Sequence, residues 1–443
     1  MKSLARPSPL SAADFTARAH AVIPGGAHTY SKGSDQFPVN APEALARGKG
    51  ARVWDLHGQE FVDWGMGVNN VLIGHAEDDI DAAAYEALRR GQSFSRPTML
   101  EVEVAERLIA LFDGMEMAKF AKNGSDANTA ALRLARAITG RSMVFFDGSA
   151  PFLGIHDWFI GTTPMNAGVP EQVSALMKAF TYNDVESVER LFEAHGSEVA
   201  AVILEVCRDR RPAPGFLERI RERCDRHGAL LVFDEVVTAF RYSVHGASSL
   251  FGVRPDLMSV GKALANGYAL TALLGKREVM ERGGIDHRHP RCFLLSTTNG
   301  AEQSALAAGR ETLQFYDTHD VISRLAEVGR QLKAGMNAVS RERGIEPYLG
   351  IEGDFDCRPI LVCRDHQGEP SFAHRTLFHQ ELLKHGVFMP WICPSFRHGD
   401  AELARTVEAC ASAAAVYSQA LERKSLDGLL EGPAVKPVFR RYN

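Results

Sequence analysis

The sequence has no long apolar run, no excess of basic residues and no apolar core near its N-terminus. None of its apolar runs approaches the ~20 residues that a transmembrane helix needs, so we expect no membrane span. Its formal net charge is −5, with 50 Lys and Arg against 55 Asp and Glu, which argues against nucleic acid as a partner. The opening stretch "MKSLARPSPLSAAD" lacks the apolar region of a secretory signal.

Paired cysteines and a dinucleotide-binding motif are also missing. The seven cysteines are scattered and form no CxxC motif, which excludes a disulfide scaffold and a zinc site. The "HRHP" run at 287–290 has no Cys or carboxylate at ligand spacing, so we interpret it as a loop and predict no metal. No GxGxxG follows the first strand with an acid about twenty residues on, which argues against the alternative of a nucleotide-binding oxidoreductase. A reducing, cytoplasmic location is the expectation.

The middle of the chain alternates short apolar runs with helical patterns, as parallel α/β sheets do. The runs "VAAVILE" (199–205) and "ALLVF" (229–233) are typical of strands buried on both faces. Between them, "FLERIRERCDRHG" has apolar residues at helical spacing and Gly228 to end the helix. "DLMSV" and "TALLG" are predicted as the next strands, the second of them antiparallel. "DANTAALRLARAITG" is predicted as a helix with Ala127, Ala131, Leu134 and Ile138 on one side.

The pattern divides the chain into a large central domain and a smaller one. We expect the large domain over residues 75–310, with a mostly parallel sheet flanked by helices. After about Gly309, long amphipathic helices and the short strand "RPILVC" indicate a smaller α+β domain over 311–443. The N-terminal segment 1–74, with "ARVWDLHGQEFVDW" as a predicted hairpin, is expected to be part of that smaller domain.

Asp234 and Lys262 each follow an apolar run, at the ends of two predicted neighbouring strands. Ligands of open α/β sheets bind outside the carboxyl ends of the strands. A half-buried lysine there can act as a Schiff-base nucleophile, and a buried carboxylate keeps a facing pyridine nitrogen protonated. A protonated pyridine ring accepts the electrons of a neighbouring carbanion. The pair therefore predicts a pyridoxal phosphate site.

The segment "KNGSDAN" offers a place for the phosphate. The backbone N–H groups of Gly124 and Ser125 and the Ser125 hydroxyl precede a predicted helix, and helix N-termini bind anions. Most glycine-containing turns of this kind are only turns, so this feature has weight only beside the Asp and Lys.

At this point the sequence resembles a known family. The segments "FDEVVTAFR", "SVGKALANG", "NGSDANTAALRLARAITGR" and "STTNGAEQSALAAG" are similar to those of the class III, fold-type I pyridoxal-phosphate aminotransferases, nearest the glutamate-1-semialdehyde aminomutase group. The resemblance extends from "PGGAHTYSKG" near the N-terminus to "GVFMPWICPSF" near the C-terminus. It implies the fold-type I architecture and pyridoxal 5′-phosphate as cofactor.

The resemblance also implies roles for single residues. Lys262 matches the Schiff-base lysine, Asp234 the acid that pairs with the pyridine nitrogen, and Val236 a residue packed on the ring. Gly124 and Ser125 match the phosphate turn.

Two further matches concern Glu205 and Thr298. Glu205 matches a family acid near the cofactor. Thr298 matches a threonine that reaches the phosphate of the neighbouring subunit, which implies a homodimer with shared active sites.

Three departures from the family pattern concern the substrate. Phe152 and Leu153 replace the usual Tyr-His pair, although a phenylalanine ring can still stack on the cofactor. Lys32 stands where aminomutases have a carboxylate-binding arginine, and keeps the charge without the bidentate geometry. The segment "PWICPSFRHGDAEL" does not reproduce the aminomutase Ser-Ala-Phe-Glu. The candidate substrate residues are Lys32, His156, Glu302 and Arg397. The alternative for each is a solvated charge or a hydrogen-bonded loop residue.

These features predict an aminotransferase with ping-pong kinetics. It would move an amino group from an amino-acid donor to a carbonyl substrate such as an oxidised sugar, a cyclitol or a semialdehyde. The first alternative is an aminomutase, which transfers the amino group within one molecule. The second is a non-catalytic binding protein of the same fold, against which the intact Lys262 and Asp234 argue.

Overall fold

The computed structural model describes residues 12–442, and these form two compact units. Unit 1 comprises residues up to Val68, Gly74–Ala76 and Ala326–Val438, and unit 2 comprises Asn69–Ile73, Glu77–Leu325 and the residues from Phe439. The expected domain boundaries were at 74/75 and 310/311. Residues 1–11, on which the expectation about a secretory signal mainly rests, lie outside the described residues.

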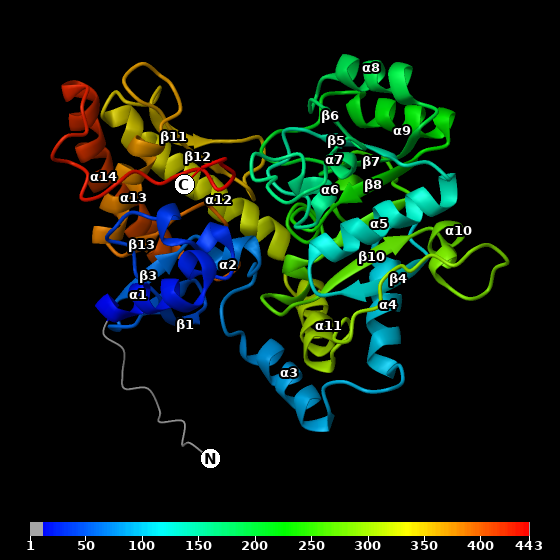
Figure 1. Ribbon diagram of the computed structural model, residues 1–443. Helices are drawn as coiled ribbons and strands as arrows, with labels where there is room; N and C mark the ends of the chain where they lie inside the picture. Colours follow the sequence, from blue (N-terminus) through cyan, green and yellow to red (C-terminus); the bar gives the residue numbers. More distant parts are fainter. Residues whose placement is uncertain (1–11, 443) are drawn as a thin grey trace. The chain divides into compact units, whose positions relative to one another are not determined.

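Unit 2 contains a seven-stranded sheet within the described chain, with strand order β4-β10-β9-β8-β7-β5-β6 (Figure 1). Strands β9, β8, β7, β5 and β6 are parallel, whereas β10 is antiparallel to both β9 and β4, as predicted for "TALLG". The strands are β4 Met117–Ala121, β5 Met143–Asp147, β6 Met177–Phe180, β7 Val199–Leu204, β8 Leu230–Asp234, β9 Leu257–Val260 and β10 Thr271–Gly275.

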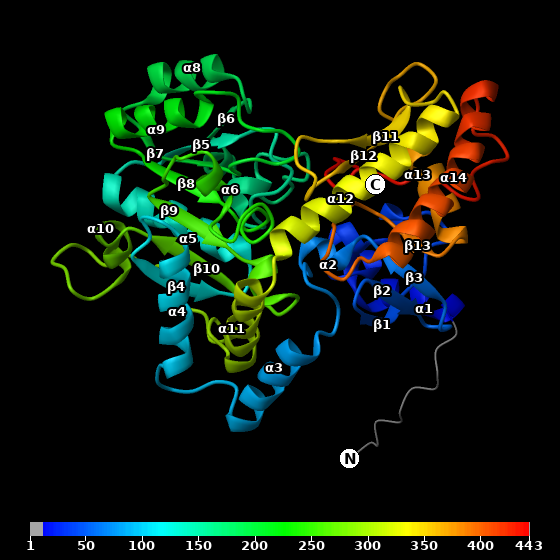
Figure 2. The same ribbon diagram turned by 180° about the vertical axis from the view of Figure 1, so that it is seen from behind.

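The helices of unit 2 differ in what they contact: α4, α5, α8, α9 and α10 contact strands of this sheet, α3 packs against α11, and α8 lies beside α9 in both ribbon views (Figures 1 and 2). They are α3 Asp78–Arg90, α4 Met99–Leu111, α5 Gly124–Thr139, α6 Asp157–Ile160, α7 Glu171–Ser174, α8 Val185–His195, α9 Phe216–His227, α10 Arg277–Met280 and α11 Gln303–Thr318. Short 3-10 turns are η4 Ala247–Leu250, η5 Lys262–Ala265 and η6 Glu281–Gly283. The architecture is the α/β, fold-type I arrangement expected from the sequence.

Local sequence explains how these helices begin and end. α9 ends at Gly228, whose left-handed φ of 63° is easy for glycine, as predicted. α5 begins after Asn123, whose side chain accepts a hydrogen bond from the Asp126 backbone N–H. The buried residues of α5 end at Ala135, and Ile138, expected on the same side of the helix as Ala127, Ala131 and Leu134, is 36% exposed in the last turn before the C-cap.

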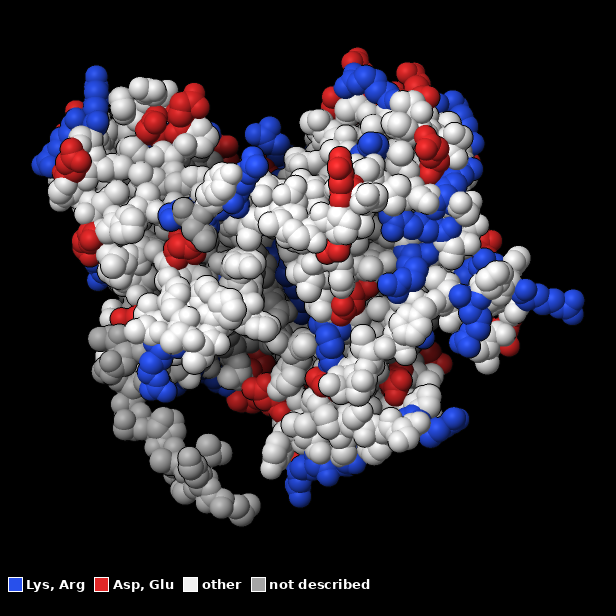
Figure 3. All heavy atoms as spheres, in the orientation of Figure 1, with Lys and Arg blue, Asp and Glu red and all other residues white. Residues whose placement is uncertain are grey.

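Charged side chains of both signs are mixed over the α8–α9 end of unit 2, as Figure 3 shows. Arg219 and Arg223 of α9 both pair with Glu189 of α8, and Arg219 also pairs with Glu222. The Arg219–Glu222 pair is exposed and contributes little to stability, whereas Arg223 and Glu189 are partly buried.

Unit 1 contains, among the described residues, a four-stranded sheet in the order β1-β2-β3-β13 and the two-stranded pair β11-β12. The predicted hairpin is confirmed, because β2 and β3 pair antiparallel. The strands are β1 Leu45–Lys49, β2 Arg52–Asp55, β3 Glu60–Asp63, β11 Leu349–Glu352, β12 Ile360–Cys363 and β13 Val387–Phe388. The helices are α1 Ala12–Val22, α2 Met66–Asn69, α12 Val321–Glu342, α13 Phe372–Lys384 and α14 Asp400–Arg423, with turns η1 Pro24–Gly26, η2 Tyr30–Lys32 and η3 Ser34–Gln36. The last residue of α2, Asn69, and residues 321–325 of α12 are counted in unit 2.

Each unit has its own apolar core. In unit 2, the alanine-rich face of α5 packs with residues of β5, β7, β8, β9 and β10. In unit 1, residues of α12, α13 and α14 pack with Trp64 and with strands β3 and β11. All seven cysteines lie in the described range and are buried free thiols. Across residues 12–442, every helix is too short or too polar to traverse a bilayer.

Candidate active site

Asp234 is the last residue of β8, and its carboxylate is buried, with 5% of the residue exposed. Its Oδ2 accepts a hydrogen bond from Asn128 Nδ2 at 2.7 Å, and its Oδ1 accepts one from the Val236 backbone N–H at 3.0 Å. The Ser259 hydroxyl lies 3.4 Å from Oδ1. The strand end thus presents a carboxylate whose two oxygens are both oriented by the protein.

The pKa of Asp234 is raised to about 6, chiefly because burial penalises the charged form. The negative charge of Glu205 raises the pKa further. The hydrogen bonds from Val236 and Asn128 and the positive charge of Lys262 lower it. This carboxylate therefore lies within the electrostatic reach of both Glu205 and Lys262.

Lys262 begins η5, directly after β9 and Gly261. Its φ is 47°, in the left-handed region that non-glycine residues seldom adopt, and such backbone strain is concentrated at functional sites. A Cβ on Gly261 would lie 2.7 Å from Thr271 Oγ1, so the chain passes close to β10 at this point. Because β8 and β9 are adjacent and parallel, Lys262 and Asp234 lie at the same edge of the sheet.

Gly124 and Ser125 are the first residues of α5, a 16-residue helix. A Cβ on Gly124 would lie 2.8 Å from Val236 Cγ2, so glycine allows the turn to pack directly against Val236. The Ser125 hydroxyl oxygen accepts a hydrogen bond from the Ile155 backbone N–H at 3.1 Å. The helix N-terminus that could hold a phosphate is therefore brought next to the strand end that carries Asp234.

Phe152 and His156 belong to the loop before α6, the short helix Asp157–Ile160. The Phe152 ring is 44% exposed and meets Phe159 edge-on, with ring centroids 5.8 Å apart, so Phe152 is not a core residue. His156 Nδ1 lies 2.8 Å from Thr129 Oγ1, and Trp158 Nε1 donates to the same hydroxyl at 2.8 Å. The histidine is thus fixed to α5.

The remaining candidates lie in two different places. Glu205 follows β7 and is 4% exposed. Thr298 lies in an exposed turn, and Glu302 caps α11 and pairs with Lys122 at 2.8 Å. Lys32 and Arg397 belong to unit 1, and all the other candidates to unit 2. Within the described chain no group of His, Cys, Asp and Glu could hold a metal ion.

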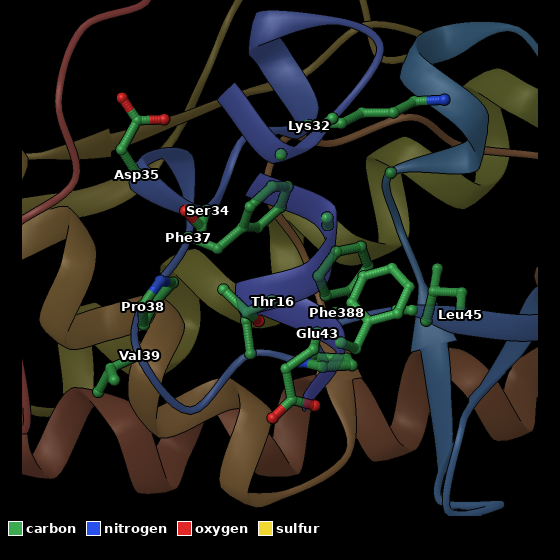
Figure 4. Close-up of a pocket in the computed structure, with 18 of the residues that line it drawn as sticks. Thr16, Lys32, Ser34, Asp35, Phe37, Pro38, Val39, Glu43, Leu45 and Phe388 are labelled. Atoms are coloured by element: carbon green, nitrogen blue, oxygen red, sulfur yellow. The ribbon is translucent and has the colours of Figure 1, made fainter. Parts of the chain in front are cut away.

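Lys32 lines a cavity of about 1010 Å³ formed by unit 1 alone, of which Arg397 is not a lining residue (Figure 4). Thr16, Phe37 and Phe388 gather in the middle of this view, and Lys32 and Glu43 extend toward its edges. Phe37 and Phe388 stack at 5.5 Å. The cavity wall is therefore mainly apolar, with charged side chains around it.

Sequence reasoning missed three residues that shape the site. Asn128 and Ser259 bind each other and Asp234, and both are almost fully buried. Glu235 is 0% exposed, and its carboxylate accepts hydrogen bonds from Thr238 and from the Ala247 and Ser248 backbone N–H groups. Asn128 could have been found from the sequence, because it is a polar residue among the alanines on the apolar side of the predicted helix.

The chain is similar to known proteins over most of its length. A family model described as aminotransferase class-III matches residues 30–347. The 3-aminobutyryl-CoA aminotransferase of Cloacimonas acidaminovorans is 32% identical over 400 residues, which cover 88% of this chain and 92% of that protein. A glutamate-1-semialdehyde 2,1-aminomutase of Desulfitobacterium hafniense is 33% identical over 421 residues, covering 88% and 95%.

Solved structures show the same fold. The internal aldimine form of the FumI protein of Sphingopyxis sp. MTA144, with pyridoxal phosphate, has a TM-score of 0.83, 29% identity, and coverage of 93% of this chain and 96% of that one. An omega-transaminase from Sphaerobacter thermophilus has a TM-score of 0.80 and 28% identity, with coverage of 94% and 98%.

Proposed function

The chain belongs to the class-III aminotransferase family, and we propose that Lys262 and Asp234 are the residues with which it uses pyridoxal phosphate to transfer an amino group. The observation that carries this assignment is that three groups suited to the cofactor lie at one edge of the sheet. A buried carboxylate, a lysine within its electrostatic reach and the N-terminus of α5 come from three separate segments.

The residues present fit the cofactor chemically. Asp234 has its oxygens held by N–H donors, which suits a carboxylate that faces a protonated pyridine nitrogen. The backbone N–H groups of Gly124 and Ser125 suit the phosphate. Val236, packed on Gly124, and the exposed ring of Phe152 offer apolar surfaces for the ring, and Glu205 adds a second acid nearby.

Bound pyridoxal phosphate supplies an electron sink for the carbanion that forms when a substrate carbon loses its proton. Lys262 Nζ would hold the cofactor through its aldehyde carbon and, once freed by an amino donor, would hold and move the substrate proton. An amine already positioned beside that proton saves the entropy of bringing in an external base. Asp234 keeps the ring nitrogen protonated throughout.

The reaction follows a ping-pong course, with an amino-acid donor first and a carbonyl acceptor second. The acceptor is an oxidised sugar, a cyclitol or a semialdehyde. Lys32 or Arg397 binds a substrate carboxylate, and His156 and Glu302 are the remaining candidates for polar substrate contacts. Support for Lys32 is its place on the wall of the unit 1 cavity.

We further propose a homodimer in the cytoplasm, in which Thr298 reaches the cofactor phosphate of the partner subunit. Support for the dimer is the exposed position of Thr298 in unit 2. Support for a reducing compartment is the burial of seven unpaired thiols.

An aminomutase remains the second candidate, because an aminomutase is among the relatives at 33% identity. The two functions differ in where the nitrogen goes. The protein is incubated with a ¹⁵N-labelled amino acid and an unrelated carbonyl acceptor, and the label in the aminated acceptor is measured. Intermolecular label supports the aminotransferase; label that stays with one carbon skeleton supports the aminomutase and contradicts the proposal.

A further inference from the structure

Asn128 is a buried polar residue on the face of α5 that is otherwise built from small apolar side chains. It is 1% exposed, and its neighbours Ala127, Ala130 and Ala131 are buried as well. Burying a carboxamide costs free energy unless all its hydrogen bonds are made. Its partners therefore show what the residue does at this position.

Both N–H donors of Asn128 and its carbonyl oxygen are engaged in hydrogen bonds. Nδ2 donates to Asp234 Oδ2 at 2.7 Å and to the Leu153 carbonyl oxygen at 2.8 Å. Oδ1 accepts from the Ser259 hydroxyl at 2.7 Å. Because Nδ2 faces two acceptors and Oδ1 faces a donor, the amide group of Asn128 has only one favourable orientation.

One of these bonds acts on the ionisation of Asp234. A donated N–H stabilises the carboxylate form and so opposes the effects of burial and of Glu205, both of which raise the pKa of Asp234. The other Asp234 oxygen is held by the Val236 backbone N–H. The Asn128 side chain orients the second oxygen of Asp234, Oδ2.

A second bond acts on the loop that carries Phe152. Asn128 holds the Leu153 carbonyl, Ser125 accepts from the Ile155 N–H, and Thr129 contacts His156 Nδ1 at 2.8 Å. These three α5 side chains therefore fix Leu153, Ile155 and His156 of one loop. The amide of Asn128 is shared between that loop and Asp234.

We propose that Asn128 is a positioning residue that locks the Asp234 carboxylate and the Phe152 loop in one arrangement and so keeps Asp234 effective as the partner of the cofactor's ring nitrogen. Ser259 assists by fixing the amide orientation. The inference rests on the proposed roles of Asp234 and Lys262, and it adds a residue that acts through Asp234 and not on the substrate.

The test uses the full-length apoprotein and pyridoxine 5′-phosphate, which lacks the aldehyde and so binds without Lys262. Absorbance of the bound ligand between pH 5 and 9 reports whether its ring nitrogen is protonated. Without Asn128, the proton shifts from the ring to Asp234. In Asn128→Ala we expect the ring to lose its proton about one pH unit lower than in the wild type. In Ser259→Ala we expect a smaller shift in the same direction.

Asn337→Ala is the matched control, because Asn337 also makes two hydrogen bonds, to the backbone of Ile351 in unit 1. The control should titrate as the wild type does. An unchanged titration in Asn128→Ala, or in Ser259→Ala if Asn128→Ala does not fold, overturns the inference. A failure of the proposed function is seen separately, as wild-type protein that forms no borohydride-reducible adduct with pyridoxal phosphate.

Discussion

Asp234 and Ser259 are register partners on the adjacent parallel strands β8 and β9. Parallel strands leave a sheet at the same edge, so the segment after Ser259, which carries Lys262, begins beside the Asp234 carboxylate. The Ser259 hydroxyl, 2.7 Å from Asn128 Oδ1, links that edge to α5. One strand pairing therefore brings together the acid, the lysine and the helix that begins with the phosphate turn.

Replacing Lys262 with alanine is expected to abolish the covalent attachment of pyridoxal phosphate and to lower kcat by at least ~10²–10⁴-fold, because the positioned amine is lost. Borohydride reduction followed by mass spectrometry measures the attachment. Lys424→Ala, which changes the exposed C-cap of α14 in unit 1, should retain the adduct. A reducible adduct that persists in Lys262→Ala would disprove the assignment.

The raised pKa of Asp234 predicts a pH dependence of apoprotein stability. Between the unfolded pKa of about 4 and the folded value of about 6, the folded state binds more protons than the unfolded state. The contribution of Asp234 to the free energy of unfolding therefore falls by about 3 kcal/mol as pH rises through this window.

Denaturant unfolding of apoprotein at pH 4.5 and pH 7 measures this effect. Asp234→Asn should become more stable relative to the wild type as pH rises. If the difference between the two proteins is the same at both pH values, the carboxylate does not have the raised pKa.

Gly124→Ala is expected to weaken binding of pyridoxal phosphate by about tenfold, because the added Cβ would lie 2.8 Å from Val236 Cγ2 and displace either the turn or the valine. Equilibrium titration of the apoprotein measures the affinity. The double variant Gly124→Ala/Val236→Ala removes the clash and should recover part of the affinity. Equal losses in the single and double variants would show that steric contact is not the cause.

Glu235→Gln is expected to destabilise the protein by about 2–4 kcal/mol, because the buried carboxylate accepts three hydrogen bonds that a carboxamide cannot all satisfy. Thermal unfolding measures the loss. Because Glu235 has a structural role, the folded variant should keep the wild-type pH profile of cofactor absorbance. A changed profile would give Glu235 a direct role at the cofactor.

Lys32→Met is expected to raise KM about tenfold for a donor with a carboxylate and to leave KM unchanged for an amine without one, because only the former loses an ion pair. Steady-state kinetics with matched donors measure this difference. Arg397→Met serves as the comparison. If Arg397→Met shows the selective effect and Lys32→Met does not, the carboxylate is bound by Arg397.

The sequence alone determined the alternation of strands and helices, because apolar periodicity and glycine positions are local properties of the chain. Thus β7, β8, β9, α9 and the β2–β3 hairpin were predicted, as was the antiparallel direction of β10. Asp234 and Lys262 could be predicted as site residues because the end of an apolar run marks the end of a strand, and both residues follow such a run. Periodicity does not show where the buried face of a helix ends, and Ile138 of α5 is 36% exposed.

Only the tertiary structure decided which residues surround the Asp234 carboxylate. Asn128 of α5 and Ser259 of β9 are distant from Asp234 in the sequence, and the pairing of β8 with β9 and the packing of α5 on the sheet make them its neighbours. It likewise showed that Glu235 supports the Gly246–Ser248 backbone and that Lys32 lines a cavity. Hydrogen bonds between residues distant in sequence depend on how the strands are ordered and paired, and no local pattern in the chain encodes that order.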